Sequence, residues 1–151
     1  MDLDQFKEVN DTHGHLAGSQ VLREVGFILK RIVTRGDATI ARYGGDEFVM
    51  ILPETSIDDG LAICEQIRKT IADHTFLGRE WAYHMPALHL AGIISASIGI
   101  AQHIPDTAST VSIDVERTKL LKRADAAMYR AKSAGKNQVV VDQELQAGQR
   151  R

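Results

Sequence analysis

A pair of glycines followed by two acids separates two short apolar runs in the stretch TIARYGGDEFVMIL. Gly44 and Gly45 lack a Cβ atom, so they can adopt positive φ angles at little steric cost and let the chain reverse direction. The flanking runs TIAR and FVMIL then predict the two antiparallel strands of a hairpin. Because neighbouring strand residues point to opposite faces, we expect Asp46 and Glu47 on opposite sides of a rigid corner. Taken alone, the two acids are typical of a solvated turn, and only a second acidic cluster would give them another meaning.

The composition is that of a globular domain and excludes several other classes of protein. The chain has 151 residues, 44% hydrophobic and 25% charged, which is enough for one domain with its own core. Its net charge of −2 does not indicate broad binding to nucleic acids or membrane surfaces. No apolar stretch is long enough to span a bilayer, and the single cysteine, Cys64, cannot form an internal disulfide. We therefore expect a cytoplasmic protein with no nucleic-acid partner and no membrane segment in this chain.

Apolar residues repeat with helical periodicity in three segments. The spacing predicts amphipathic helices over residues 17–33, 56–73 and 117–134. Ser19 is a candidate N-cap of the first helix. Ser56 opens the second helix as part of a capping box, because Asp59 follows it three residues later.

Strands and loops are predicted in the remaining segments. The expected strands are residues 39–43 and 47–52 of the hairpin, a buried strand at 93–101 and a last short strand at 137–141. Residues 76–92 and 103–116 show no clear period and are predicted as loops.

The order of these elements indicates an α+β fold. If residues 2–4 end a first strand, the pattern is a ferredoxin-like βαββαβ with its two helices on one face of an antiparallel central sheet and an added C-terminal strand. Residues 1–141 then form one domain whose first strand is truncated, and residues 142–151 form a polar C-terminal tail.

Asp2 and Asp4 provide the second acidic cluster. In a βαββαβ sheet the first strand lies beside the second strand of the hairpin, so Asp2 and Asp46 are expected to face each other across one strand spacing. Two carboxylates repel unless a cation joins them. Hard oxygen ligands suit Mg²⁺ or Mn²⁺, which commonly hold nucleotide phosphates. The sequence therefore predicts a divalent-cation site at this corner of the sheet.

Several separated motifs make the chain resemble the diguanylate cyclases of the GGDEF-domain family. In order they are DLDQFKEVNDTHGHLAGSQVL, RYGGDEF, SIGIA and ADAAMYRAKSAGKN, within the span from Asp2 to Val141. The resemblance implies a fold like the palm of nucleotide cyclases and polymerases. It also implies a bacterial signalling transferase that joins two nucleoside triphosphates into a 3′,5′-cyclic dinucleotide, usually cyclic di-GMP from GTP, and releases pyrophosphate. Such an enzyme acts as a homodimer, because one domain binds one triphosphate.

The resemblance assigns a role to each matching position. Four residues are implied as ligands of Mg²⁺ or Mn²⁺, the third through its main-chain carbonyl: Asp2, Asp46, Leu3 and Glu47. Asp46 and Glu47 are also implied in catalysis, with Glu47 assisting deprotonation of the attacking 3′-hydroxyl. Four residues are implied to bind the triphosphate, the first two through backbone N–H groups: Gln5, Phe6, Lys132 and Lys136. Asn10 and the residue at position 19 are implied to contact the base.

The chain departs from the family pattern at two points besides position 19. Many members carry an RxxD product-inhibition site, but here Arg35 is followed at the Asp position by Ala38, so the inhibitory site is degenerate. The sequence also opens inside the first strand, and we expect a longer protein with an upstream sensory or regulatory domain. These departures leave open an alternative function, a non-catalytic module that binds nucleotide and signals to a partner.

Ser19 stands where the family normally has Asp for the guanine edge. A carboxylate only accepts hydrogen bonds and so matches guanine N1–H and N2–H₂, whereas a hydroxyl also donates to adenine N1. The chain thus resembles the hybrid promiscuous branch, which takes ATP beside GTP and forms cyclic AMP-GMP (cGAMP). The alternative is that Ser and Asp are interchangeable helix N-caps at this position.

Overall fold

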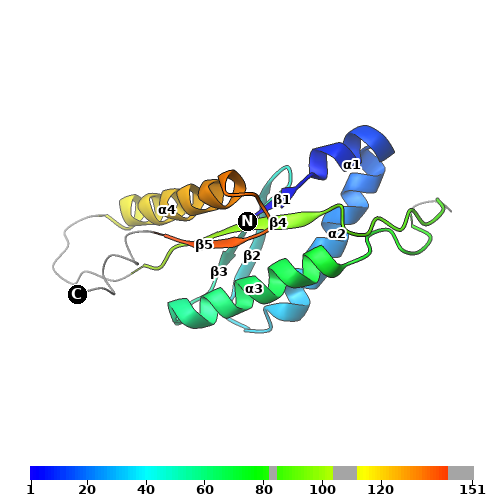
Figure 1. Cartoon of the computed structure of the whole chain (residues 1–151). Coiled ribbons are helices and arrows are strands. Elements are labelled where there is room, and N and C mark those ends of the chain that lie inside the picture. Colours follow the sequence, from blue (N-terminus) through cyan, green and yellow to red (C-terminus); the bar gives the residue numbers. More distant parts are fainter. Residues whose placement is uncertain (82–84, 104–111, 143–151) are drawn as a thin grey trace.

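A five-stranded sheet with helices on both faces organises the chain (Figure 1). The computed structural model describes residues 1–81, 85–103 and 112–142. The elements in chain order are β1 (Asp2–Asp4), α1 (Phe6–His13), α2 (His15–Ile32), β2 (Thr39–Gly44), β3 (Glu47–Ile51), α3 (Ile57–Asp73), β4 (Ser95–Ile100), α4 (Ile113–Ser133) and β5 (Val139–Val141).

The strand order β2-β3-β1-β4-β5 places the short strand β1 at the centre of the sheet. β1 is antiparallel to both neighbours, with Asp2 paired to Glu47 of β3 and to Ser97 of β4. The predicted ferredoxin-like order and antiparallel central sheet are confirmed. The added strand β5 runs parallel to β4, so the complete sheet is mixed.

The main core lies between the sheet and the helices α2 and α3. These two helices contact each other and share one face of the sheet, as predicted for the βαββαβ unit. The core side chains include Leu3, Val21, Val25, Leu29, Phe48, Ile67 and Ile71. α4 covers the opposite face, where it packs on β4 and β5.

Gly99 of β4 sets how closely α4 approaches the sheet. A Cβ atom at this position would lie 2.1 Å from the carbonyl oxygen of Ala124 and 2.3 Å from the backbone nitrogen of Met128. These are backbone atoms of a helix, so they cannot rotate away. The helix therefore rests directly on the strand backbone, and this contact fixes the height of the α4 C-terminus over the end of β1.

The helix ends agree with the sequence at one site and differ at another. Ser56 caps α3 as predicted: its Oγ accepts from the Asp59 N–H at 3.1 Å and lies 2.6 Å from the Asp59 carboxylate. The predicted cap at Ser19 is wrong, because α2 already begins at His15 and the N-cap is Gly14, with φ 82°. Gly14 alone joins α1 to α2. Because glycine has no capping side chain, the sequence does not show the usual N-cap pattern at this helix start.

α4 begins four residues before the predicted position. It starts at Ile113 with Ser112 at its N-cap, so residues 113–116 are helical and not part of a loop. Asp114 and Glu116 lie in the first turn, where negative charge is favourable beside the free backbone N–H groups. Residues 104–111 of the loop predicted at 103–116 lie outside the described residues.

The predicted loop at 76–92 and the predicted tail at 142–151 each contain at least one buried residue of the domain. Phe76 and Leu90 form an isolated β-bridge and are buried, which anchors both ends of the long segment after α3. Asp142, assigned from the sequence to the tail, is buried and its carboxylate lies 2.6 Å from Nε of Arg123. Residues 143–151 lie outside the described part of the chain.

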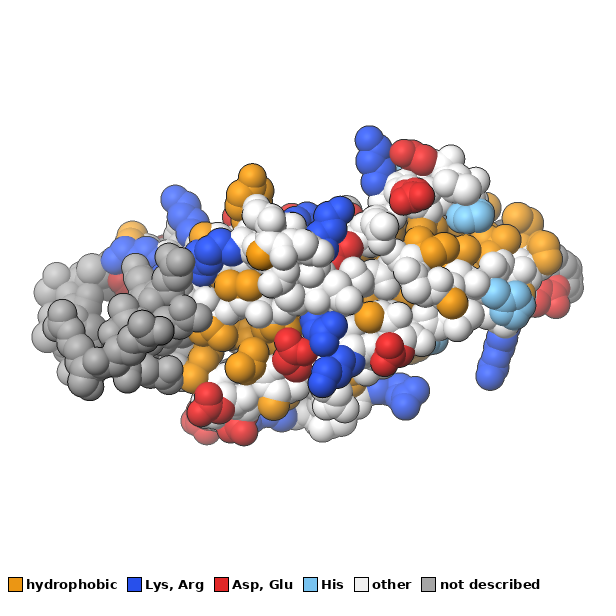
Figure 2. Space-filling view, viewed as in Figure 1, with side chains coloured by type: hydrophobic (Ala, Val, Ile, Leu, Met, Phe, Trp, Pro, Cys, Tyr) orange, Lys and Arg blue, Asp and Glu red, His pale blue; other side chains and the backbone are white. Residues whose placement is uncertain are grey.

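The surface agrees with the weak net charge of the sequence. Acidic and basic side chains are interspersed over the face seen in Figure 2, and neither sign forms a continuous patch there. Within the described ranges, none of the helices combines the length and the hydrophobicity needed to cross a membrane.

The contact at Gly99 leads to a stability prediction. Gly99→Ala is expected to lower the free energy of unfolding by about 1–3 kcal/mol, because overpacking against a rigid backbone shifts α4. Gly60→Ala, a helical position where a Cβ would meet nothing within 4 Å, is expected to be neutral or to stabilise by up to about 1 kcal/mol. Urea denaturation of both variants measures the difference, and equal effects would contradict the role of Gly99.

Candidate functional site

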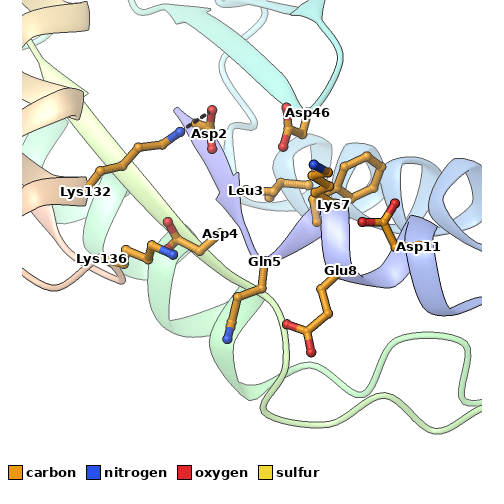
Figure 3. A pocket seen from close by; sticks show the side chains of 11 residues that line it. Asp2, Leu3, Asp4, Gln5, Lys7, Glu8, Asp11, Asp46, Lys132 and Lys136 are labelled. Atoms are coloured by element: carbon orange, nitrogen blue, oxygen red, sulfur yellow. Dashed lines mark ion pairs between the residues drawn. The ribbon is translucent and has the colours of Figure 1, made fainter.

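A pocket at the C-terminal end of β1 collects charged residues from distant parts of the chain (Figure 3). Its volume is about 530 Å³. The lining residues come from β1, the start of α1, the hairpin turn, the end of α4 and the turn after it: Asp2, Leu3, Asp4, Gln5, Phe6, Lys7, Glu8, Asp11, Asp46, Lys132 and Lys136. Most of the residues predicted to hold metal and phosphate therefore lie in one pocket, whereas Glu47, Asn10 and Ser19 are not among those that line it.

An ion pair between Asp2 and Lys132 crosses the pocket. Nζ of Lys132 lies 2.7 Å from Oδ2 of Asp2, whose side chain is buried (Figure 3). Burial raises the pKa of Asp2 above its usual value; the hydrogen bond from Lys132 opposes this shift, and the carboxylates of Asp46 and Glu47 add to it. The acids are thus close enough to repel one another, and a cation between them is favoured.

The same carboxylates act on Lys132. Burial alone would lower the pKa of its ammonium group, but the hydrogen bond and negative charge of Asp2, together with Asp46 and Asp4, raise it above the usual value. Lys132 is therefore charged at neutral pH and serves as the counter-ion of the acidic cluster.

The hairpin holds one acid in its turn and the other at the start of its second strand, in agreement with the predicted strand from residue 47. β3 begins at Glu47, so Asp46 lies in the turn itself and not in the strand. Only Gly45 of the glycine pair has a positive φ, 38°, and its carbonyl accepts a hydrogen bond from Nε of Arg42 at 2.8 Å. Asp46 lines the pocket and Glu47 does not, so the expectation of one acid on each side of the corner stays a prediction.

Asp4 has a role that the sequence did not reveal. Its buried carboxylate accepts hydrogen bonds from Oγ of Ser95 at 2.7 Å, Oγ of Ser97 at 2.8 Å and the backbone N–H of Asn137 at 3.0 Å. Three donors occupy this carboxylate, so Asp4 holds the surrounding segments in place, whereas Asp2 is joined to the single cation Lys132. Asn137 directly follows Lys136, so Asp4 also anchors the loop that carries this lysine.

The N-terminus of α1 opens into the pocket. Gln5 is its N-cap in a left-handed conformation, with φ 62°. The N–H groups of the first helical residues, Phe6 and Lys7, have no acceptor within the helix, and this end of a helix attracts anions. Lys7 adds a cationic side chain that the sequence analysis missed. Lys7 and Asp11 are four residues apart and so share one side of the helix. This spacing was the sequence signal that placed Lys7 on the side of α1 that lines the pocket.

The residues predicted to contact the base lie beside the pocket. The Asn10 side chain packs against Gly18 of α2, which is adjacent in sequence to the exposed Ser19. At the predicted inhibitory position, Arg35 forms an exposed ion pair with Asp37, with both nitrogen–oxygen distances 3.2 Å. Ala38 supplies no charge, so the arginine is already occupied by its neighbour.

The donor set suits a hard divalent cation, although it is not assembled as a cage. Among the residues that the structure describes, no three His, Cys, Asp or Glu side chains gather closely enough to hold a metal ion. Asp46 and Glu47 nevertheless help to raise the pKa of the Asp2 carboxylate, and carboxylate oxygens are the ligands that such a cation prefers. The ammonium group of Lys132 takes the position of a cation at Asp2, so metal binding requires this lysine to release the carboxylate.

Most of the chain matches proteins of known family. Residues 1–138 match the family model described as diguanylate cyclase, GGDEF domain. The chain is 37% identical over 142 residues to diguanylate cyclase A of Treponema denticola and 38% identical over 143 residues to the response regulator PleD of Caulobacter vibrioides. Both alignments cover 93% of this chain but 33% and 28% of the relatives. The chain thus spans about a third of the length of the curated relatives it matches.

Solved structures show the same fold. The GGDEF domain of DgcB from Caulobacter crescentus, in complex with c-di-GMP, superposes with a TM-score of 0.74 at 32% identity, covering 93% of this chain and 73% of that chain. The active GGEEF domain of a diguanylate cyclase from Vibrio cholerae gives a TM-score of 0.72 at 26% identity, covering 93% and 78%.

The ion pair of Lys132 leads to a prediction about metal binding without nucleotide. Lys132→Met removes the competing cation from Asp2, so Mn²⁺ affinity is expected to rise by roughly fivefold, or about 1 kcal/mol. Lys136→Met is the matched control, because Lys136 lines the same pocket and no ion pair joins it to Asp2 in the described residues. Titration of Mn²⁺ followed by electron paramagnetic resonance measures both, and a rise in both variants or in neither would contradict the assignment.

Proposed function

The chain belongs to the GGDEF-domain family of diguanylate cyclases, and we propose that its pocket joins two molecules of GTP into cyclic di-GMP with release of pyrophosphate. The observation that supports this function is the shared pocket, in which Asp2 and Asp46 lie with Lys132 of α4, Lys136 of the following turn and the N-terminus of α1. Carboxylates suited to a cation and ammonium groups suited to phosphates thus lie in one pocket of a size that fits a nucleotide.

The triphosphate is proposed to lie between α1 and the end of α4. The backbone N–H groups of Gln5 and Phe6 bind phosphate oxygens at the positive end of the helix. Lys132 and Lys136 contact the outer phosphates and neutralise the charge that develops on the leaving pyrophosphate. In this arrangement Lys132 exchanges its carboxylate partner for a phosphate, which frees Asp2 when substrate enters.

The reaction consists of the same displacement carried out twice. The 3′-oxygen of each nucleotide forms a bond to the α-phosphorus of the other, and the bond between that phosphorus and pyrophosphate breaks. Mg²⁺ or Mn²⁺, held by Asp2, Asp46, Glu47 and the Leu3 carbonyl, would supply Lewis-acid activation of the hydroxyl and of the α-phosphate. Glu47, directly opposite Asp2 in the sheet, accepts or passes on the proton of the 3′-hydroxyl.

A homodimer is proposed because each domain has one such pocket among its described residues. Two pockets must face each other before the 3′-hydroxyl of one nucleotide reaches the α-phosphate of the other. An upstream sensory or regulatory domain would control this encounter in the whole protein, which acts in the cytoplasm where GTP is available.

Relaxed base selection is proposed from Ser19. Its hydroxyl is exposed in the second turn of α2 and does not cap the helix, so the explanation by interchangeable N-caps loses its support. A hydrogen bond to a charged group contributes about 1.5–3 kcal/mol. Replacing the family's carboxylate by a hydroxyl therefore relaxes guanine preference by roughly ten- to a hundredfold, and ATP becomes a second substrate.

The cyclase function is tested with GTP and Mg²⁺ and detection of cyclic di-GMP by mass spectrometry. A version of the protein held as a dimer is expected to form product, and Asp46→Asn to abolish turnover while the fold persists, because the variant loses a ligand charge. Asp11→Asn, an exposed acid on the edge of the pocket, serves as a control expected to retain most activity. Binding of GTP without product in the unmodified dimer would instead support the non-catalytic module.

The base preference gives a separate prediction. With equal GTP and ATP, the unmodified domain is expected to form cyclic AMP-GMP alongside cyclic di-GMP. Ser19→Asp restores an acceptor for guanine N1–H and N2–H₂ and is expected to shift the mixture toward cyclic di-GMP, whereas Ser19→Ala retains the mixture. If the unmodified domain makes only cyclic di-GMP, the relaxed selection is wrong while the cyclase function stands.

A further inference from the structure

Gly18 of α2 contacts a side chain, whereas Gly99 contacts the backbone of a helix. A Cβ atom on Gly18 would lie 2.0 Å from Oδ1 of Asn10, 2.9 Å from its Cγ and 3.1 Å from Cζ of Phe6. The nearest atoms therefore belong to the end of a side chain that is proposed to contact the base. We infer that Gly18 is a positioning residue for base recognition, since its bare backbone provides the surface on which the Asn10 carboxamide rests.

The geometry of the α1–α2 corner supports this inference. Gly14 joins the two helices, and its N–H donates to the carbonyl of Asn10 at 2.9 Å, which closes the last turn of α1. Phe6 and Asn10 are four residues apart and so lie on the same face of α1. Phe6 is buried in the core and Gly18 is buried beneath both side chains, so α1 cannot rise from α2 to make room for a larger residue.

The carboxamide is held by packing and retains its polar groups for a ligand. Within the described ranges, the Asn10 side chain forms no hydrogen bond and is partly exposed. An Asn side chain offers both donors and an acceptor, as does the edge of a purine base. Gly18 thus holds this carboxamide through its Oδ1 atom, without a hydrogen-bond partner in the described ranges, and Ser19 follows Gly18 directly in the chain. The inference rests on the proposed function, because it concerns the nucleotide of that same site.

An alanine at position 18 is expected to displace Asn10 without unfolding the domain. The clashing atom is the movable end of a side chain, so the carboxamide rotates to another rotamer. Alanine is also a better helix former than glycine, which offsets part of the crowding. The phosphate contacts come from other residues and remain. The effect is therefore confined to the part of the affinity that depends on the base.

The experiment compares binding of GTP with binding of inorganic tripolyphosphate, which has no base, by calorimetry with Mg²⁺ present. Gly18→Ala is expected to weaken GTP binding by roughly tenfold and to leave tripolyphosphate binding unchanged. Gly26→Ala in the same helix, where a Cβ meets nothing within 4 Å, is expected to change neither. Asn10→Ala should lose as much GTP affinity as Gly18→Ala, and the double variant no more, because both remove the same contact.

The outcomes separate this inference from the proposed function. If the unmodified protein binds tripolyphosphate and GTP equally, no base contact exists and both the inference and the assignment of Asn10 fail. If the unmodified protein prefers GTP and Gly18→Ala binds it equally well, only the positioning role of Gly18 is overturned. A parallel loss of GTP and tripolyphosphate in Gly18→Ala would show a general structural effect and would also overturn it.

Discussion

The buried carboxylate of Asp4 is the interaction on which the site geometry depends. It accepts hydrogen bonds from two serines of β4 and from the backbone that follows Lys136, and so joins β1, β4 and the turn between α4 and β5. Burying a carboxylate without hydrogen-bond donors costs free energy. The folded domain therefore keeps these segments close to Asp4. Asp2 lies two residues earlier on the same face of β1, and its distance from Lys132 of α4 and from Lys136 of the following turn follows from this arrangement.

Two glycines show how the same absence of a side chain serves different purposes. At Gly99 the opposing atoms are helix backbone, so the contact defines the spacing between a strand and α4. At Gly18 the opposing atom is a carboxamide oxygen, so the contact selects a rotamer. The first controls a layer of the fold and through it the phosphate end of the site, and the second concerns only the base end.

Local patterns in the sequence predicted the hairpin, the two helices of the βαββαβ unit and the family, because periodicity and turn residues act over a few positions. They failed where distant residues decide the outcome. The partners of Asp4 lie 91 to 133 residues away, so its structural role had no local signal. Ser19 was predicted as the cap of α2 because the true N-cap, Gly14, has no side chain that marks a helix start.

The long reach of Asp4 has a consequence for the order in which the protein becomes functional. The central strand β1 is synthesised before the strands that flank it, which come from residues 47–51 and 95–100, and before Asn137, which donates a hydrogen bond to Asp4. Pairings of this range form late in folding, because the intervening chain must first be ordered. A nascent chain that has completed the hairpin therefore carries the acidic turn without the lysines opposite it. The pocket is assembled only when nearly the whole domain has been translated, so an unfinished chain has no place to hold a nucleotide.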